Sequence, residues 1–151
     1  MEDHSQLSEI TVTYKTKVKA RDRPRINSSK DAYKILSDLW SADTIEYQES
    51  FYVLLVNKAN AVLGYKLISI GGMAGTVVDV KQLLAIALKG NASGIIMAHN
   101  HPSGNLQPSQ ADFELTRKVK AACEVLELAL LDHLILSPDN SYYSFADECV
   151  I

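Results

Sequence analysis

Residues 94–112 read GIIMAHNHPSGNLQPSQAD, and the fold of the whole chain is predicted outward from this stretch. Gly94 to Ala98 have the length and composition of a short buried strand. Ser103-Gly104 is typical of a tight turn. Ser109, with Asp112 three residues later, is typical of a helix start, where the serine caps and the carboxylate faces back. The stretch therefore predicts a strand, a loop and a helix in succession.

Segments of strand and helix character alternate on both sides of this stretch, by their apolar periodicity and turn residues. The expected strands are Ile10–Tyr14, Ser50–Val56, Ala61–Ile70 and Leu128–Leu136, with a short closing element over Tyr142–Ile151. The expected helices follow caps at Ser28 or Ser29, at Asp79 and at Ser109, the first with an apolar stripe that runs to Trp40. This alternation predicts an α/β domain, and the apparent hairpin over residues 50–70 makes its sheet mixed.

The composition is that of an ordinary globular protein and excludes several classes. At 151 residues the chain is expected to form one domain, with 47% hydrophobic and 22% charged residues. A net charge of −3 and a pI near 5.8 give no general nucleic-acid signature. No signal peptide or membrane-spanning run is present, so we expect a cytoplasmic protein without membrane association. Cys123 and Cys149 are expected to be buried, reduced and structural.

Three side chains of the central stretch suit one metal ion. His99 and His101 are two residues apart, so in extended backbone they project to the same side. Pro102 favours that extended conformation at His101. Asp112 adds a carboxylate from the first turn of the helix. Two imidazoles and one carboxylate suit tetrahedral zinc with water in the fourth position, so we expect one Zn²⁺ per chain.

Each part of this pattern also has a plainer interpretation, and the general base is open. Two nearby histidines are a weak signal, and Ser109 with Asp112 is also a helix cap. The H-x-E and P-C-x-x-C signature of zinc deaminases is absent, as is H-E-x-x-H. A hydrolase would need a base, and the residues alone offer three carboxylates, Glu46, Glu49 and Glu114.

The pattern resembles the JAMM motif of JAB/MPN domains, in which an upstream glutamate precedes H-x-H, ten residues and an aspartate that ends S-x-x-D. Here His101 and Asp112 have that separation. The chain is more specifically similar to the RadC-type branch, which carries AHNHPSG, PS-x-x-D and L-D-H-x-I. Residues 98–104, 108–112 and 131–135 match these motifs, and the likeness runs from about Ser28 to Phe145.

The resemblance implies a cytidine-deaminase-like α/β sandwich with a mixed sheet flanked by helices and a zinc metallopeptidase-type site. Related JAMM domains cut peptide or isopeptide bonds of ubiquitin-like tails, so a peptide or protein substrate is expected. His99, His101 and Asp112 match the metal ligands. Ser109 matches the serine that stabilises the tetrahedral intermediate, and Glu49 matches the glutamate that acts through the metal-bound water. The expected division is an N-terminal strand and basic linker over 1–27, and a RadC-like JAB/MPN domain over 28–151.

Two other functions compete with a zinc hydrolase. RadC-type proteins carry a DNA-repair label, and Lys17–Arg25 is basic, so the chain could be a DNA-associated module without peptidase activity. This segment also suits a solvated linker, and the residues before Ser28 are too few for the helix-hairpin-helix region of longer members. A structural zinc domain would need a fourth ligand such as His133, whose apolar flanks favour a core histidine. Asp132 is a candidate for orienting a histidine. No pattern indicates an oligomeric state.

Overall fold

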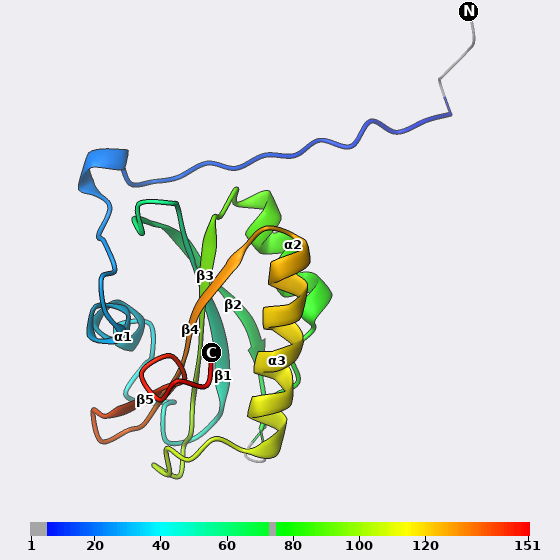
Figure 1. The fold of residues 1–151 in the computed structure, drawn as a ribbon. Coiled ribbons are helices and arrows are strands. Elements are labelled where there is room, and N and C mark those ends of the chain that lie inside the picture. Colours follow the sequence, from blue (N-terminus) through cyan, green and yellow to red (C-terminus); the bar gives the residue numbers. More distant parts are fainter. Residues whose placement is uncertain (1–5, 73–74) are drawn as a thin grey trace, which may run out of the picture.

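The computed structural model describes residues 6–72 and 75–151, which form a mixed five-stranded sheet with helices on both faces (Figure 1). The strands are β1 (Ser50–Val56), β2 (Val62–Ile70), β3 (Gly94–Asn100), β4 (Ala129–Leu136) and β5 (Tyr142–Ser144). Their order across the sheet is β2-β1-β3-β4-β5. Only β3 and β4 are parallel neighbours within these residues, and the other neighbouring strands are antiparallel. The predicted α/β class with a mixed sheet is confirmed.

The helices begin where the sequence places their caps. They are α1 (Ser29–Ser37), α2 (Val80–Lys89) and α3 (Gln110–Val125), preceded by a 3-10 helix, η1 (Ala20–Asp22). Ser28, Asp79 and Ser109 each accept a hydrogen bond from a backbone N–H in the first turn of the helix that follows. Because α1 ends at Ser37, Trp40 lies in the turn after the helix and not on its stripe. In the described part of the chain no helix is long and apolar enough to cross a bilayer.

Side chains of β3 alternate between two layers of core, because helices cover both faces of the sheet. Ile95 and Met97 belong to the cluster that packs under α2 and α3. Ile96 and Ala98 belong to the cluster that packs under α1. In Figure 1, α1 lies on one side of the sheet and α2 and α3 lie on the other. Continued along the strand, this alternation directs His99 towards α3 and Asn100 towards the opposite side.

Three further details of the sequence prediction are wrong. Residues 10–14 are described and form no strand: Ile10 is 84% exposed, and the segment runs past the sheet in extended form (Figure 1). Alternation alone cannot make a strand there, because the backbone of residues 10–14 is not hydrogen-bonded to any described strand. The segment that pairs with the chain at the start of β2 is a later one: Ile26 N–H donates to the carbonyl of Asn60, and the carbonyl of Pro24 accepts from Val62 N–H. β3 continues two residues beyond Ala98 to Asn100. Cys123 is buried as expected, but Cys149 is exposed.

Candidate metal centre

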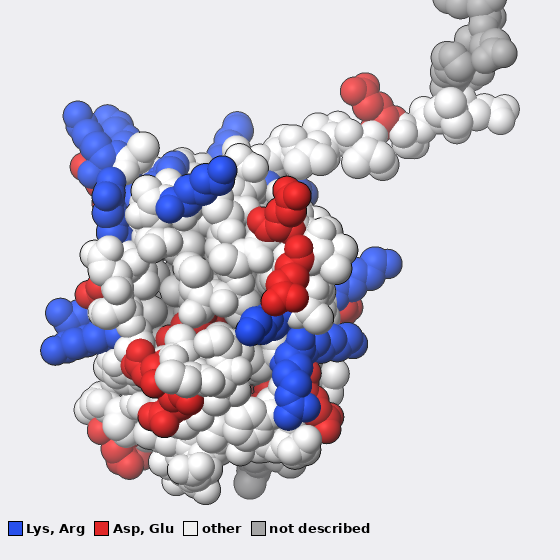
Figure 2. Space-filling view, in the orientation of Figure 1, with Lys and Arg blue, Asp and Glu red and all other residues white. Residues whose placement is uncertain are grey.

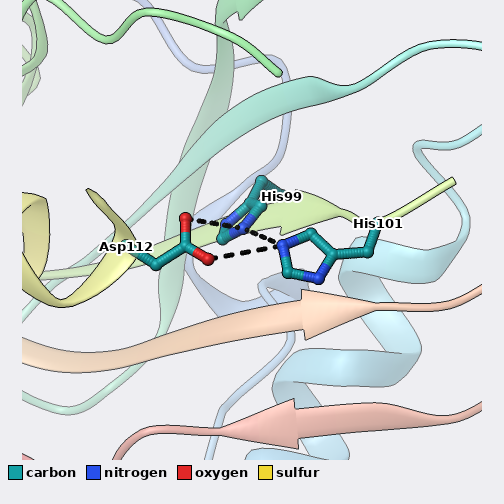
Figure 3. Close-up of side chains that lie close together, drawn as sticks. All are labelled: His99, His101 and Asp112. Atoms are coloured by element: carbon teal, nitrogen blue, oxygen red, sulfur yellow. Dashed lines mark hydrogen bonds and ion pairs between the residues drawn. The ribbon is translucent and has the colours of Figure 1, made fainter. Parts of the chain in front are cut away.

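His99, His101 and Asp112 converge where β3 ends and α3 begins (Figure 3). His99 Nε2 lies 3.0 Å from His101 Nε2 and 3.3 Å from Asp112 Oδ1. His101 Nε2 lies 3.4 Å from Asp112 Oδ2. His99 is almost fully buried, whereas the other two residues are half-buried and open to a pocket. The strand spacing that predicted two imidazoles on one side is therefore realised in the fold.

The helix cap and the candidate site use the same atoms. Ser109 Oγ accepts from the backbone N–H of Asp112 at 3.1 Å, and Asp112 Oδ2 accepts from the backbone N–H of Ser109 at 2.8 Å. This reciprocal pair is a capping box. It fixes the direction of the Asp112 carboxylate, whose two oxygens then face His99 and His101. The cap is therefore formed, and it leaves both Asp112 oxygens facing the two histidines.

The donor set fits a cation. His101 Nδ1 lies 2.7 Å from the carbonyl oxygen of Asn105, and because a carbonyl only accepts, Nδ1 carries the proton of the neutral ring. The lone pair of His101 Nε2 is then turned towards His99 and Asp112. A metal-ligating histidine commonly donates its other N–H in this way. Neutral nitrogens and one carboxylate at this separation suit zinc, and also other divalent metals that accept imidazole.

Electrostatics separate the two carboxylates beside this centre. Burial works against charge on Asp112, but hydrogen bonds from His101 and His99, when these rings carry a proton on Nε2, outweigh it and hold the pKa of Asp112 well below its ordinary value. Burial raises the pKa of Glu49 above its ordinary value, partly opposed by His99 and His101. For His101, burial lowers the pKa but hydrogen bonds with Asp112 and Asn105 outweigh it, so the pKa is raised. A pocket in which the pKa values of neighbouring ionisable groups are shifted in opposite directions is typical of a functional site.

Glu49 is the carboxylate that the fold brings to the centre. It lines a pocket of about 660 Å³ together with His101, Ser109 and Asp112. Its backbone carbonyl accepts from the N–H of Gly71 at 2.8 Å, which ties it to the start of the next connection. Of the other two candidates, Glu46 is exposed, and exposed Glu114 accepts from the side chain of Gln110 on the surface of α3. Met73 and Ala74, in the connection that follows β2, lie outside the described residues.

Asn100 is a residue of the site that sequence reasoning missed. Its side chain is fully buried, and Oδ1 accepts from Trp40 Nε1 at 2.9 Å and from the backbone N–H of Ser50 at 2.8 Å. Its Nδ2 donates to the carbonyl oxygens of Ile45 at 2.8 Å and Gln48 at 3.0 Å. An asparagine amide offers two donors and two acceptor lone pairs, so each is used. Asn100 therefore ties the segment that carries Glu49 to the strand that carries His99.

Asp132 has a different role from the one first considered for it, whereas His133 is the core histidine that its apolar flanks favoured. Asp132 Oδ1 accepts from the backbone N–H groups of His133 and Ala146, and Oδ2 accepts from Ser144 Oγ, so this carboxylate holds the chain after β5. It does not orient a histidine ring. His133 is fully buried, as expected for a core histidine, and its two ring nitrogens contact His99 and Thr116. Both nitrogens being engaged leaves neither for a fourth ligand position, which weighs against a closed structural zinc site.

Fold and site together define an α/β domain with a JAB/MPN-type arrangement of two histidines and an aspartate. The family model described as "RadC-like JAB domain" matches residues 26–150. The chain belongs to the RadC-like JAB domain family. Its first residue in the packed core, Ile26, is also where that match begins.

Several curated bacterial proteins are similar to this chain, and each is named only "UPF0758 protein". The protein from Flavobacterium johnsoniae is 45% identical over 124 residues, covering 82% of this chain and 52% of the relative. That from Porphyromonas gingivalis is 38% identical over 135 residues, covering 87% and 58%. That from Aquifex aeolicus is 37% identical over 131 residues, covering 87% and 54%. The chain therefore spans about half the length of these relatives.

Proposed function

We propose that this chain is a zinc-dependent hydrolase that cleaves a peptide or isopeptide bond in a protein substrate. The observation that carries the proposal is one pocket lined by Glu49, His101, Ser109 and Asp112. The buried His99 contacts His101 and Asp112, and these three residues would be the metal ligands. Three protein ligands leave one coordination position for water or substrate, which is the usual layout of a catalytic zinc site. A zinc ion held there would supply a Lewis acid and lower the pKa of its water.

The side chains around the ligands then have defined tasks. Glu49, whose pKa burial raises, is suited to take a proton from the attacking water and return it to the leaving amine. The cap uses Ser109 Oγ as an acceptor, so its hydroxyl proton remains available to donate to the developing oxyanion. Asn100 holds the backbone before and after Glu49 at the required place through Gln48 and Ser50. These are roles for the chain's own residues and follow from their positions around the pocket.

The test is zinc content and turnover in matched variants. We expect about one zinc per chain by mass spectrometry, lost when His99 and His101 are both replaced by alanine. A panel of fluorogenic peptides and isopeptide-linked substrates should detect turnover. Glu49→Gln should keep the zinc and reduce turnover about 100-fold or more, as loss of a general base does. Exposed Glu46→Gln is the matched control and should leave both unchanged.

Two results would contradict the proposal at different points. Protein that takes up no zinc when zinc is supplied would remove the metal site and the hydrolysis with it. Zinc-loaded Glu49→Gln with the turnover of the native sequence would remove the role of Glu49 while leaving the metal site in place.

A DNA-associated module is the second candidate, and one observation favours it. Lys17, Lys19, Arg21 and Arg25 are all exposed, and Figure 2 shows Lys and Arg gathered in the region of η1. Over the rest of this face the basic side chains are interspersed with acidic ones, which argues against an extended phosphate-binding surface (Figure 2). Binding of duplex DNA that weakens steeply with salt would support this function, and no binding at low salt would dismiss it.

A further inference from the structure

A buried run of hydrogen bonds connects His99 to Asp112 behind the metal centre. Thr116 Oγ1 donates to the backbone carbonyl of Asp112 at 2.7 Å. His133 Nδ1 lies 2.7 Å from Thr116 Oγ1, and His133 Nε2 lies 2.8 Å from His99 Nδ1. His99, Thr116 and His133 are each at most 1% exposed, so water does not share these bonds. The run therefore starts at one candidate ligand residue and ends at another.

The direction of the protons along this run follows from its first bond. A carbonyl oxygen can only accept, so the hydroxyl proton of Thr116 is committed to Asp112. Thr116 Oγ1 must then accept from His133 Nδ1–H, which leaves the other nitrogen of the neutral His133 ring as an acceptor. His99 Nδ1–H donates to that nitrogen, and the lone pair of His99 Nε2 faces His101 and Asp112.

The opposite direction would leave one close contact, between Thr116 Oγ1 and the carbonyl oxygen of Asp112, without a proton between its atoms. His99 would then carry its proton on Nε2, the atom that faces the other candidate ligands. Thr116 would donate to His133, and its Oγ1 would lie 2.7 Å from the Asp112 carbonyl with no hydrogen bond to offset the repulsion. Buried oxygens in such contact are costly, so the first direction is favoured.

Aromatic side chains hold the two rings of this run in their planes. Phe51 stacks on His99 with ring centroids 5.8 Å apart and planes 9° from parallel. Phe145 stacks on His133 at 4.7 Å and 13°. Because both histidine rings are clamped, neither can turn over to exchange its nitrogens without repacking the core. Hydrogen bonds and stacking therefore act on the same two rings.

We propose that His133 and Thr116 are positioning residues that hold His99 as its Nδ1–H tautomer, with the Nε2 lone pair directed into the metal centre. The inference rests on the metal site of the proposed function. It concerns how the chain prepares a ligand in advance, and so it is defined for the metal-free protein as well. The hydrogen-bonded connection between residues 99, 116 and 133 cannot be recognised in the sequence, because these residues share no local motif.

The first test is the tautomer itself. Long-range ¹H–¹⁵N NMR spectra of metal-free protein should show His99 and His133 protonated at Nδ1 and unprotonated at Nε2. In Thr116→Val, which keeps the shape but removes the hydroxyl, His133 is released from this arrangement and its Nδ1 signature should change. Thr116→Ser restores a hydroxyl and should restore the native spectrum.

The second test is zinc affinity, measured by competition with a chromophoric chelator. Loss of a group that orients a metal ligand commonly costs 10–100-fold, so we expect a loss of about this size in Thr116→Val and in His133→Phe. Thr116→Ser should stay within about threefold of the native sequence by the same reasoning. Val119→Ala, at a buried apolar position of the same helix, is the control for general destabilisation and should not change the affinity.

The outcomes separate this inference from the proposed function. His99 protonated at Nε2 but not at Nδ1 in the metal-free native protein would overturn the positioning role. Native zinc affinity in folded Thr116→Val and His133→Phe would overturn it as well. If the native protein binds zinc but hydrolyses no substrate, only the proposed function fails. If it binds no zinc, the proposed function fails and the tautomer of the metal-free protein still decides the positioning role.

Discussion

Replacing Asn100 by alanine should detach the segment that carries Glu49 from the strand that carries the histidines. The native amide joins four groups: the Trp40 indole, the backbone N–H of Ser50 and the carbonyls of Ile45 and Gln48. Alanine keeps the backbone of β3 and removes all four contacts. Glu49 lies between two of the contacted residues, so its position should loosen while His99 and His101 remain on their strand.

The size of the effect can be worked out from these contacts. A typical hydrogen bond contributes about 1 kcal/mol net, so four of them set an upper value of about 4 kcal/mol. The Ile45 and Gln48 carbonyls belong to half-buried residues and can be rehydrated, which reduces their share. Ser50 is only 8% exposed, so its backbone N–H would be left buried without a hydrogen-bond partner. We therefore expect a loss of about 3 kcal/mol in the free energy of unfolding.

Urea denaturation followed by far-UV circular dichroism measures this loss, and the fluorescence of Trp40, the single tryptophan, reports the local change. Turnover should fall more than zinc affinity does. Asn57→Ala is the matched control, because Asn57 Oδ1 accepts from two backbone N–H groups in a turn remote from the site. A loss below about 1 kcal/mol in Asn100→Ala, the value of a single bond, would refute the reasoning.

Three further predictions concern titratable side chains. Cys149 is exposed and should react quickly with a thiol reagent in the native protein. Cys123 is buried, and burial raises its pKa to about 11, so it should react only on unfolding. Equal reaction rates for the two thiols would contradict the fold. Burial raises the pKa of Glu49, so its charge destabilises the metal-free protein at neutral pH. Glu49→Gln should therefore raise the Tm at pH 7, and the gain should vanish below about pH 4, where both states are protonated; a lower Tm at pH 7 would reverse the sign. The pKa of Asp112 is lowered, so its charge stabilises the folded protein above about pH 4, and this stabilisation is lost as the pH falls further. Asp112→Asn should therefore lower the Tm of the metal-free protein at pH 7. An unchanged Tm would contradict this.

Local signals in the sequence predicted most of the fold. The run Ser50–Val56 has the observed limits of β1, and the caps at Ser28, Asp79 and Ser109 start the observed helices. These features depend on neighbouring residues only, so they can be read without the tertiary structure. The alternation at Ile10–Tyr14 is equally regular, yet no strand forms there. A strand depends on a partner elsewhere in the chain, which local alternation does not reveal.

The candidate site divides in the same way. His99, His101 and Asp112 lie within one continuous stretch, so their spacing indicated that they would meet. Glu49 could be selected from three carboxylates only through a family resemblance. The roles of Asn100 and Thr116 depend on which strand end lies beside which loop and helix. Two weak signals were present: residue 100 is directed opposite to residue 99 in a strand, and Thr116 lies one helical turn after Asp112.

The alternation of side chains at the end of β3 explains why the parts of this site depend on one another. His99 points towards α3, where Asp112 lies, and Asn100 points to the other side, where it holds the chain around Glu49. Two adjacent residues of one strand thus connect the candidate ligand set with the carboxylate that is proposed to act as base. A shift of β3 by one residue against its neighbours would exchange these directions. The buried residues on both faces of β3 therefore serve the site as well as the core, because they fix that register.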